Sequence, residues 1–200
     1  MRVQRRIAAA VAALLLVWGC GDDGGSVRAG GPLERPEFRD GSSLSLTAPP
    51  EGIGRPLFFG MVVLDNRGSE PATIDRIELV EPSRNARLAS AYVVGADRDA
   101  SATSSGEWPP PPSLFRRGSW RPALGAAVPP KATPQGRIGV ELLLVIDIPR
   151  REQYSFRAVR VEYHVGRRRY WIQVPYSFVV CADRTKRCKS IEPLPRKPSD

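Results

Sequence analysis

Residues 159–180 read VRVEYHVGRRRYWIQVPYSFVV, in which apolar and polar side chains alternate on both sides of a short basic turn. Before the turn, the alternate apolar positions are Val159, Val161, Tyr163 and Val165. After it they are Tyr170, Ile172, Val174, Tyr176, Phe178 and Val180. A period of two residues is typical of a β-strand that buries one face. The glycine and arginines at 166–169 therefore predict a β-hairpin.

Other segments extend this β pattern in both directions. Residues 138–148 place isoleucine, valine and leucine at every second position, which predicts a long, half-buried strand. Shorter strands are predicted at residues 44–47, 57–64, 73–80 and 88–94. The turn-forming residues 65–71 predict a second hairpin between two of them. Pro175 has no N–H to donate, so its strand is expected to be an edge strand or to be bulged there.

The fold class that follows is all-β. Outside residues 1–19 no segment keeps the apolar spacing of an amphipathic helix, and twenty prolines interrupt the chain. About seven strands separated by turn signals predict an antiparallel β-sandwich. The run VVLDNRGSEPATI at residues 62–74 resembles the strand-turn-strand segment of immunoglobulin-like domains on bacterial surfaces. This resemblance implies an immunoglobulin-like sandwich and carries no activity with it.

The N-terminus has the composition of an export signal. Three arginines within residues 2–6 precede an apolar run at residues 7–18. Twelve residues are too few to span a bilayer about 30 Å thick. An uncleaved anchor and an ordinary secretory signal are the alternatives, and the paired arginines at 5–6 keep a twin-arginine export route open.

The segment Val17-Trp18-Gly19-Cys20 resembles the lipobox of bacterial lipoproteins, with Trp18 as its departure from that pattern. The resemblance implies that Cys20 becomes the lipid-modified N-terminus. The protein would then be attached to a membrane through this lipid, on the outer face of the cytoplasmic membrane or on the periplasmic or extracellular side.

Composition divides the rest of the chain. We expect a signal peptide at residues 1–19, a flexible tether at 20–41, a β-sandwich domain at 42–190 and a disordered tail at 191–200. Within the domain, residues 101–136 form a long proline-rich insertion. Its tryptophans, Trp108 and Trp120, could contact a partner or cover one face of the sandwich. The second interpretation is favoured because large aromatic side chains are usually buried.

Two cysteines remain once Cys20 is assigned to lipid. Cys181 and Cys188 are expected to form a disulfide, since the chain has too few further ligands for a structural zinc site. The single histidine, His164, lies on the predicted polar face. A calcium loop at residues 97–107 fails because the glycine that such a loop needs is absent. We expect no metal, no cofactor and no catalytic site.

Charge placement gives the remaining signal. The chain has a net charge of +9, and removal of the three arginines of residues 1–19 leaves 27 basic and 21 acidic residues, a charge of +6. The predicted strand directions bring the loops at 149–155 and 181–188 to one end of the domain, opposite the arginines at 167–169. The basic residues expected at that shared end are Arg150, Arg151, Arg184, Lys186, Arg187 and Lys189.

These residues form either solvated loop tips or a surface that binds anions. The possible partners are anionic lipid, an anionic wall polymer or an acidic envelope protein, and nucleic acid is excluded by the expected location. The function predicted is a lipid-anchored binding or accessory module of the bacterial cell envelope. The alternative is an envelope hydrolase or transferase whose site is not recognisable in the sequence.

Overall fold

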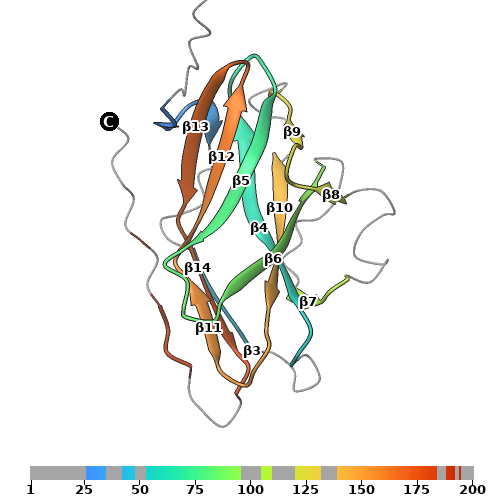
Figure 1. The fold of residues 1–200 in the computed structure, drawn as a ribbon, viewed down its shortest axis with the longest axis vertical. Coiled ribbons are helices and arrows are strands. Elements are labelled where there is room, and N and C mark those ends of the chain that lie inside the picture. Colours follow the sequence, from blue (N-terminus) through green and yellow to red (C-terminus); the bar gives the residue numbers. More distant parts are fainter. Residues whose placement is uncertain are drawn as a thin grey trace, which may run out of the picture.

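A computed structural model describes residues 26–34, 42–47, 53–95, 105–109, 120–131, 139–183, 188–191 and 194. For residues 42–47, 61 and 105–107 the backbone alone is described. These residues form strands and turns and contain no helix, so the predicted all-β class is confirmed (Figure 1). In this part of the chain there is accordingly no helix long and apolar enough to cross a bilayer.

Two larger sheets make up most of the molecule. The first has the order β1 (Arg28–Ala29), β13 (Arg168–Val174), β12 (Ala158–Val165), β5 (Ala72–Val80) and β9 (Ala127–Val128). The second has the order β2 (Leu33–Glu34), β4 (Leu57–Asn66), β10 (Val140–Asp147), β6 (Arg87–Val94) and β8 (Trp120–Pro122), with β7 (Ser105–Glu107) also paired to β4. Pairing within both is antiparallel except between β1 and β13.

A third, smaller sheet continues the hairpin of the first. Its order is β11 (Gln153–Phe156), β14 (Tyr176–Cys181) and β3 (Ser42–Thr47), the last parallel to β14. Strand β11 runs into β12 after one residue, and β13 runs into β14 in the same way. The hairpin is therefore longer than the sequence predicts, because residues 153–155, expected in a loop, pair with the returning strand together with Phe156.

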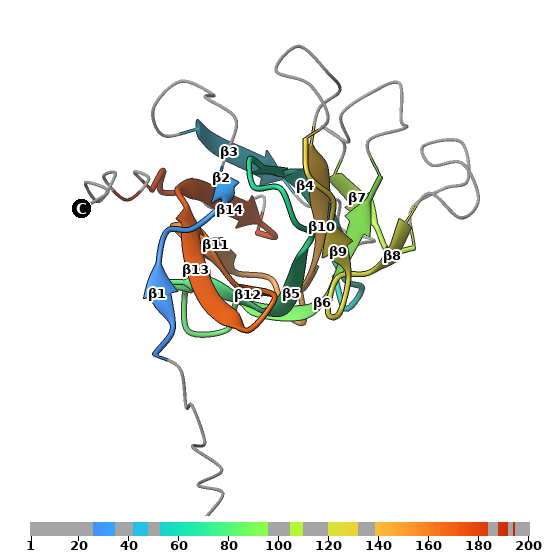
Figure 2. The same ribbon diagram turned by 90° about the horizontal axis from the view of Figure 1, so that it is seen from above.

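The main hydrophobic core lies between the sheets, which curve around a common interior (Figure 2). The aromatic centre of this core joins β4 to β14. The centroid of the Phe59 ring lies 4.4 Å from that of Phe178 and 5.1 Å from that of Tyr176. Strand β12 supplies Val159, Val161 and Tyr163, all of them fully buried. The alternation that predicted the hairpin is thus the alternation of its core-facing side chains.

Pro175 separates β13 from β14, as its missing N–H requires. Val159 pairs with Val174 and Phe156 with Phe178, so one strand has an additional residue between these two pairs. The predicted bulge is confirmed, although β14 is a central strand of its sheet and not an edge.

The second predicted hairpin is wrong. Strands β4 and β5 belong to different sheets, so residues 67–71 cross from one layer to the other. Asn66 organises this crossing: its side-chain amide donates to the carbonyls of Glu70 and Val128 at 2.8 and 2.9 Å and accepts from the Gly68 N–H at 2.9 Å. The backbone carbonyl of Asn66 accepts from Lys131 instead of from β5.

Strand β10 is buried on both faces and not on one, which corrects the half-buried strand expected from its alternation. Its outward-facing Leu143 and Val145 lie under a cluster of Tyr92, Trp108 and Trp120. The Tyr92 ring stacks on Trp108 at 4.6 Å and meets Trp120 edge-on at 4.9 Å. Both tryptophans of the insertion therefore cover a sheet face, as the favoured interpretation predicts.

Candidate functional site

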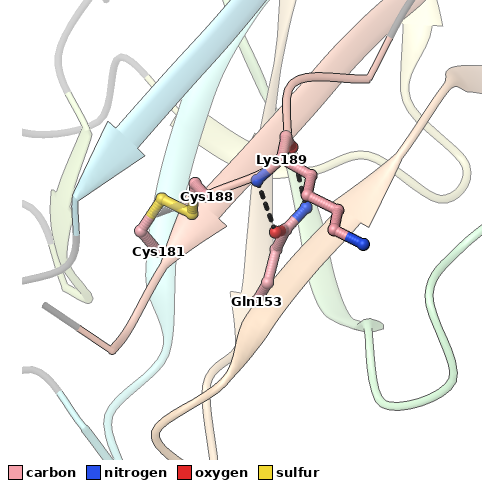
Figure 3. Close-up of a disulfide and its surroundings, with 4 residues drawn as sticks. All are labelled: Gln153, Cys181, Cys188 and Lys189. Carbon is pink, nitrogen blue, oxygen red and sulfur yellow. Dashed lines mark hydrogen bonds between the residues drawn. A yellow bond between two sulfur atoms is a disulfide. The ribbon is translucent and has the colours of Figure 1, made fainter. Parts of the chain in front are cut away.

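The last strand of the hairpin ends in a disulfide. Gln153 at the start of β11 pairs with Cys181 at the end of β14, and Cys181 is bonded to Cys188 (Figure 3). Their Cα atoms lie 5.8 Å apart, within the usual range for a disulfide. The predicted pairing is confirmed.

Gln153 also fixes the chain that follows the disulfide. Its side-chain amide donates to the Lys189 carbonyl at 2.9 Å and accepts from the Lys189 N–H at 2.9 Å, which is visible in Figure 3. One side chain thereby satisfies both backbone groups of Lys189. The exposed Lys189 is held beside β11 and does not trail away from it.

A pocket of about 390 Å³ opens at this same end. Three arginines, Arg55, Arg87 and Arg150, contribute to its wall. The other lining residues are Gly54, Pro56, Asn85, Asp147, Ile148 and Pro149. The three arginines come from the entry to β4, the first residue of β6 and the turn after β10, so the pocket exists only in the folded chain.

Hydrogen bonds hold these segments together. The Gly54 N–H donates to the carbonyl of Ile148 at 2.8 Å, which joins the entry of β4 to the end of β10. Arg87 faces Asp147 across the β6–β10 ladder. The hydroxyl of buried Tyr154 accepts from the Arg150 N–H at 2.8 Å and donates to its carbonyl at 3.1 Å. Burial raises the pKa of Tyr154, so its hydroxyl stays protonated at neutral pH.

Cationic side chains outnumber carboxylates around the pocket, where Glu152 accepts a hydrogen bond from the lining Asn85 at 2.6 Å. Asp147 is the single carboxylate in its lining, against three guanidinium groups. Arg84, Arg151 and Lys189 are exposed on the surrounding loops. A guanidinium group presents a planar fork of N–H donors that matches the oxygens of a phosphate or carboxylate. We call this surface the disulfide end; its residues are Arg55, Arg84, Arg87, Arg150, Arg151 and Lys189.

The predicted basic cluster is thus placed in part. Arg150, Arg151 and Lys189 lie at one end, as the strand directions predict, whereas Arg184, Lys186 and Arg187 lie outside the described residues. Sequence reasoning missed Arg55 and Arg87. The strand pattern could have placed them at this end. Each lies where a strand of the second sheet begins, and both of these strands are antiparallel to β10, whose end lies here.

The opposite end carries a second group of arginines. Gly166 and Arg167 form the turn of the long hairpin, and Arg168 and Arg169 begin β13. Arg28 stands next to them, since β1 pairs with β13 through Arg28 and Tyr170. All four arginines are exposed, and none forms an ion pair with another described residue. We call Arg28, Arg167, Arg168 and Arg169 the hairpin end.

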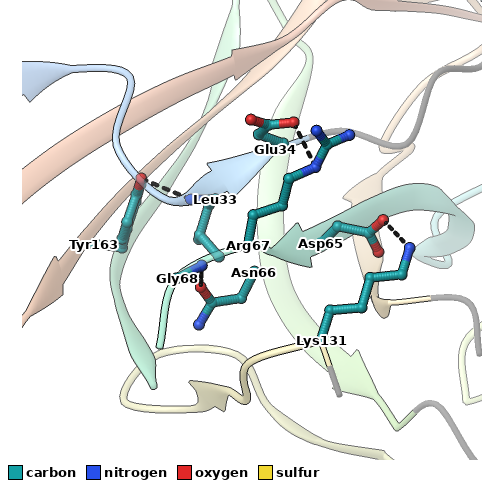
Figure 4. Close-up of polar contacts among 8 residues, drawn as sticks. All are labelled: Leu33, Glu34, Asp65, Asn66, Arg67, Gly68, Lys131 and Tyr163. Carbon is teal, nitrogen blue, oxygen red and sulfur yellow. Dashed lines mark hydrogen bonds and ion pairs between the residues drawn. The ribbon is translucent and has the colours of Figure 1, made fainter. Parts of the chain in front are cut away.

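The N-terminal segment 26–34 is fixed across this end, although it lies within the predicted tether 20–41. The buried Tyr163 hydroxyl accepts from the Leu33 N–H at 3.1 Å (Figure 4). The same hydroxyl donates to the Gly30 carbonyl at 2.8 Å. Burial raises the pKa of Tyr163 to about 12, so this donor is retained at neutral pH. The Gly30 N–H donates to the Trp171 carbonyl at 2.9 Å.

The buried side chain of Leu33 also stabilises the attachment of this segment. Its side chain is 1% exposed within the main core, and such burial contributes about 2 kcal/mol. The Glu34–Arg67 ion pair at 2.8 Å, also in Figure 4, is exposed on both partners and contributes at most about 1 kcal/mol. An isolated leucine in a polar region does not predict this anchoring, which explains why the segment reads as a tether.

The other candidate residues give no catalytic arrangement. His164 lies on the polar face as expected, with its Nδ1 2.8 Å from the Asp75 carboxylate. No cluster of three metal-ligating side chains occurs among the residues that the structure describes. The calcium loop considered at residues 97–107 lies largely outside the described residues. Residues 96–104 are not described, and 105–107 are described by backbone alone.

Comparisons with known proteins add little to this geometry. No family model matches the chain, and no curated protein does. Two solved structures share 10% identity with it: the Vibrio cholerae VesB protease, at a TM-score of 0.29 over 74% of this chain, and a mutant of the CFA/I enterotoxigenic E. coli adhesin CfaE, at 0.36 over 76%. The chain covers 31% and 48% of those proteins respectively.

Substitution of Gly31 tests how the N-terminal segment is held. A Cβ atom there would lie 2.5 Å from the Tyr163 hydroxyl and 2.7 Å from the Tyr170 ring. Gly31→Ala should therefore lower the free energy of unfolding in urea by about 3 kcal/mol. The matched control is Gly30→Ala, because Gly30 also has a positive φ, 84°, but open space around it. This control should lower the free energy of unfolding by about 1 kcal/mol. Equal losses from the two variants would mean that the close approach of Gly31 to Tyr163 and Tyr170 contributes nothing.

Proposed function

We propose that this chain is a lipid-anchored binding module of the bacterial envelope, built on an immunoglobulin-like β-sandwich. Two facing sheets with a shared core support the sandwich architecture. The crossing at residues 67–71 supports it as well, because it passes from one sheet to the other. The short strands β1, β2, β7, β8 and β9 add to the seven or so that the sequence predicts.

The lipid anchor rests on the lipobox resemblance at residues 17–20 and the short apolar run before it. It implies a location outside the cytoplasm, where the Cys181–Cys188 disulfide is stable. Mass spectrometry of the native protein tests it. A peptide that begins at Cys20 and carries a diacylglyceryl group would establish the anchor, and retention of Met1 would exclude it.

The ligand we propose for the disulfide end is an anionic wall polymer. The observation that carries this proposal is the convergence of Arg55, Arg87 and Arg150 on one pocket. One phosphate or carboxylate group fits such a pocket, and the exposed Arg84, Arg151 and Lys189 around it suit further charges along a chain. A polymer with repeated anionic groups matches this spread better than a single small anion does.

The pocket lining favours binding over catalysis. Hydrolases and transferases that act through the protein's own groups use a nucleophile or general base held in the site. Of the described residues that line the pocket, none is serine, threonine, cysteine, histidine or lysine, and Asp147 is the one carboxylate. Three guanidinium groups around that carboxylate suit electrostatic recognition.

Binding to two polyanions of similar charge tests the proposal. The whole mature chain, with Cys20→Ser to prevent lipidation, should bind long-chain polyphosphate at low salt and release it as salt rises past ~0.15 M, where the screening length is ~8 Å. Arg87→Gln combined with Arg150→Gln should weaken binding at least about tenfold, because two charge-assisted contacts are lost.

The matched control is Arg76→Gln with Arg121→Gln, which removes the same charge from exposed positions on β5 and β8. It should change affinity about twofold or less, through net charge alone. Equal losses from both pairs, or no binding at low salt, would overturn the proposed pocket. Preference for poly-L-glutamate over polyphosphate would point to an acidic protein partner instead.

A further inference from the structure

The direction of β1 shows how the chain enters the domain. Strand β1 is parallel to β13, with Arg28 level with Tyr170 and Ala29 level with Trp171. Because β13 starts at Arg168, the chain before Arg28 leads back toward the hairpin turn. The Tyr163 hydroxyl and the buried Leu33 fix the segment that follows. The point of entry is therefore held at the hairpin end.

The distance from a lipid on Cys20 to this point is short. Six residue steps separate Cys20 from Ser26, the first described residue. Fully extended, they span about 20 Å. Thirteen residue steps separate Gly166 from Gln153 along the hairpin, or roughly 40 Å of strand. A lipid anchor would therefore keep the hairpin end near the membrane, with the disulfide end at the other extreme of the strands.

The charges of the hairpin end suit a membrane surface. Its four arginines are exposed and form no ion pair with a described residue. Two of the nearby acidic groups are already engaged: Glu34 with Arg67, and Asp75 with His164. Among the described residues, Glu70 also lies near Gly166 and offsets part of this charge. The tip of the hairpin thus presents a net positive charge.

We propose that the hairpin end, Arg28 with Arg167, Arg168 and Arg169, binds anionic phospholipid headgroups and holds the domain upright. This inference rests on the lipid anchor proposed above. It assigns the two basic ends different ligands: headgroup phosphates at the hairpin end and an anionic polymer at the disulfide end. It also places the polymer-binding pocket on the side away from the membrane that holds the anchor.

The role of these arginines is orientation, not recruitment. Each basic residue at an anionic membrane strengthens binding about fivefold, so four of them alone bind weakly. The anchor holds them at a millimolar effective concentration beside the bilayer, because it lies within ~20 Å. Weak contacts at such a concentration are sufficient to bias the tilt of the domain.

Vesicle binding by the whole unlipidated mature chain, Cys20→Ser, separates the two ends. The probe is phosphatidylcholine vesicles with about a quarter phosphatidylglycerol at low salt, with pure phosphatidylcholine as the reference. Replacing Arg167, Arg168 and Arg169 with Gln should weaken binding about a hundredfold, at about fivefold per charge. The matched variant carries Arg87→Gln, Arg150→Gln and Arg151→Gln and should lose about threefold or less.

Each outcome decides the question. A larger loss from the disulfide-end variant, equal losses from both variants, or no preference for anionic vesicles would overturn the assignment of headgroups to the hairpin end. The assay needs no lipid on Cys20, so its result is independent of that modification. Polyphosphate binding by the same two variants reports on the pocket separately, and we expect the hairpin-end variant to retain it.

Discussion

The antiparallel ladder of β12 with both β5 and β13 determines which residues stand at each end of the molecule. Val159, Val161 and Tyr163 point from this ladder into the core, and a shift of one residue would turn all of them toward solvent. The register is therefore strongly specified. With it fixed, the basic turn after Val165 and the disulfide beyond β14 lie at opposite extremes, roughly 40 Å apart along the strands.

The buried hydroxyl of Tyr163 links this ladder to the N-terminal segment. It satisfies the Gly30 carbonyl and the Leu33 N–H, two backbone groups that would be costly to leave unpaired. Because the segment is held there, the point at which the chain enters the domain is fixed relative to both basic surfaces. The proposed division into a membrane-facing end and a polymer-binding end rests on this constraint and on the proposed anchor.

Sequence periodicity predicts the longer strands well because their core positions alternate locally. Periodicity cannot predict which strands pair, or which side chains cover a sheet face, when the contacting residues are far apart in the sequence. Residues 65–71 suit a hairpin or a crossing between sheets equally, and the structure forms the crossing because Asn66 bonds to Val128 and Lys131. Strand β10 reads as half-buried because nothing near it in sequence reveals the aromatic cover. Of the three pocket arginines the sequence predicts only Arg150 at this end, because the fold brings Arg55 and Arg87 to it from distant parts of the chain.

The central claim is that the domain stands with its hairpin end toward the membrane. Energy transfer from a dye to labelled lipid tests it directly, in the native lipidated protein reconstituted into vesicles containing phosphatidylglycerol. Ser69, exposed in the crossing whose Glu70 lies near Gly166, marks the hairpin end, and exposed Arg151 marks the other. A dye at Ser69→Cys should transfer strongly and one at Arg151→Cys weakly, because roughly 40 Å of strand separates the two ends. Equal transfer, or stronger transfer from Arg151→Cys, would contradict this orientation.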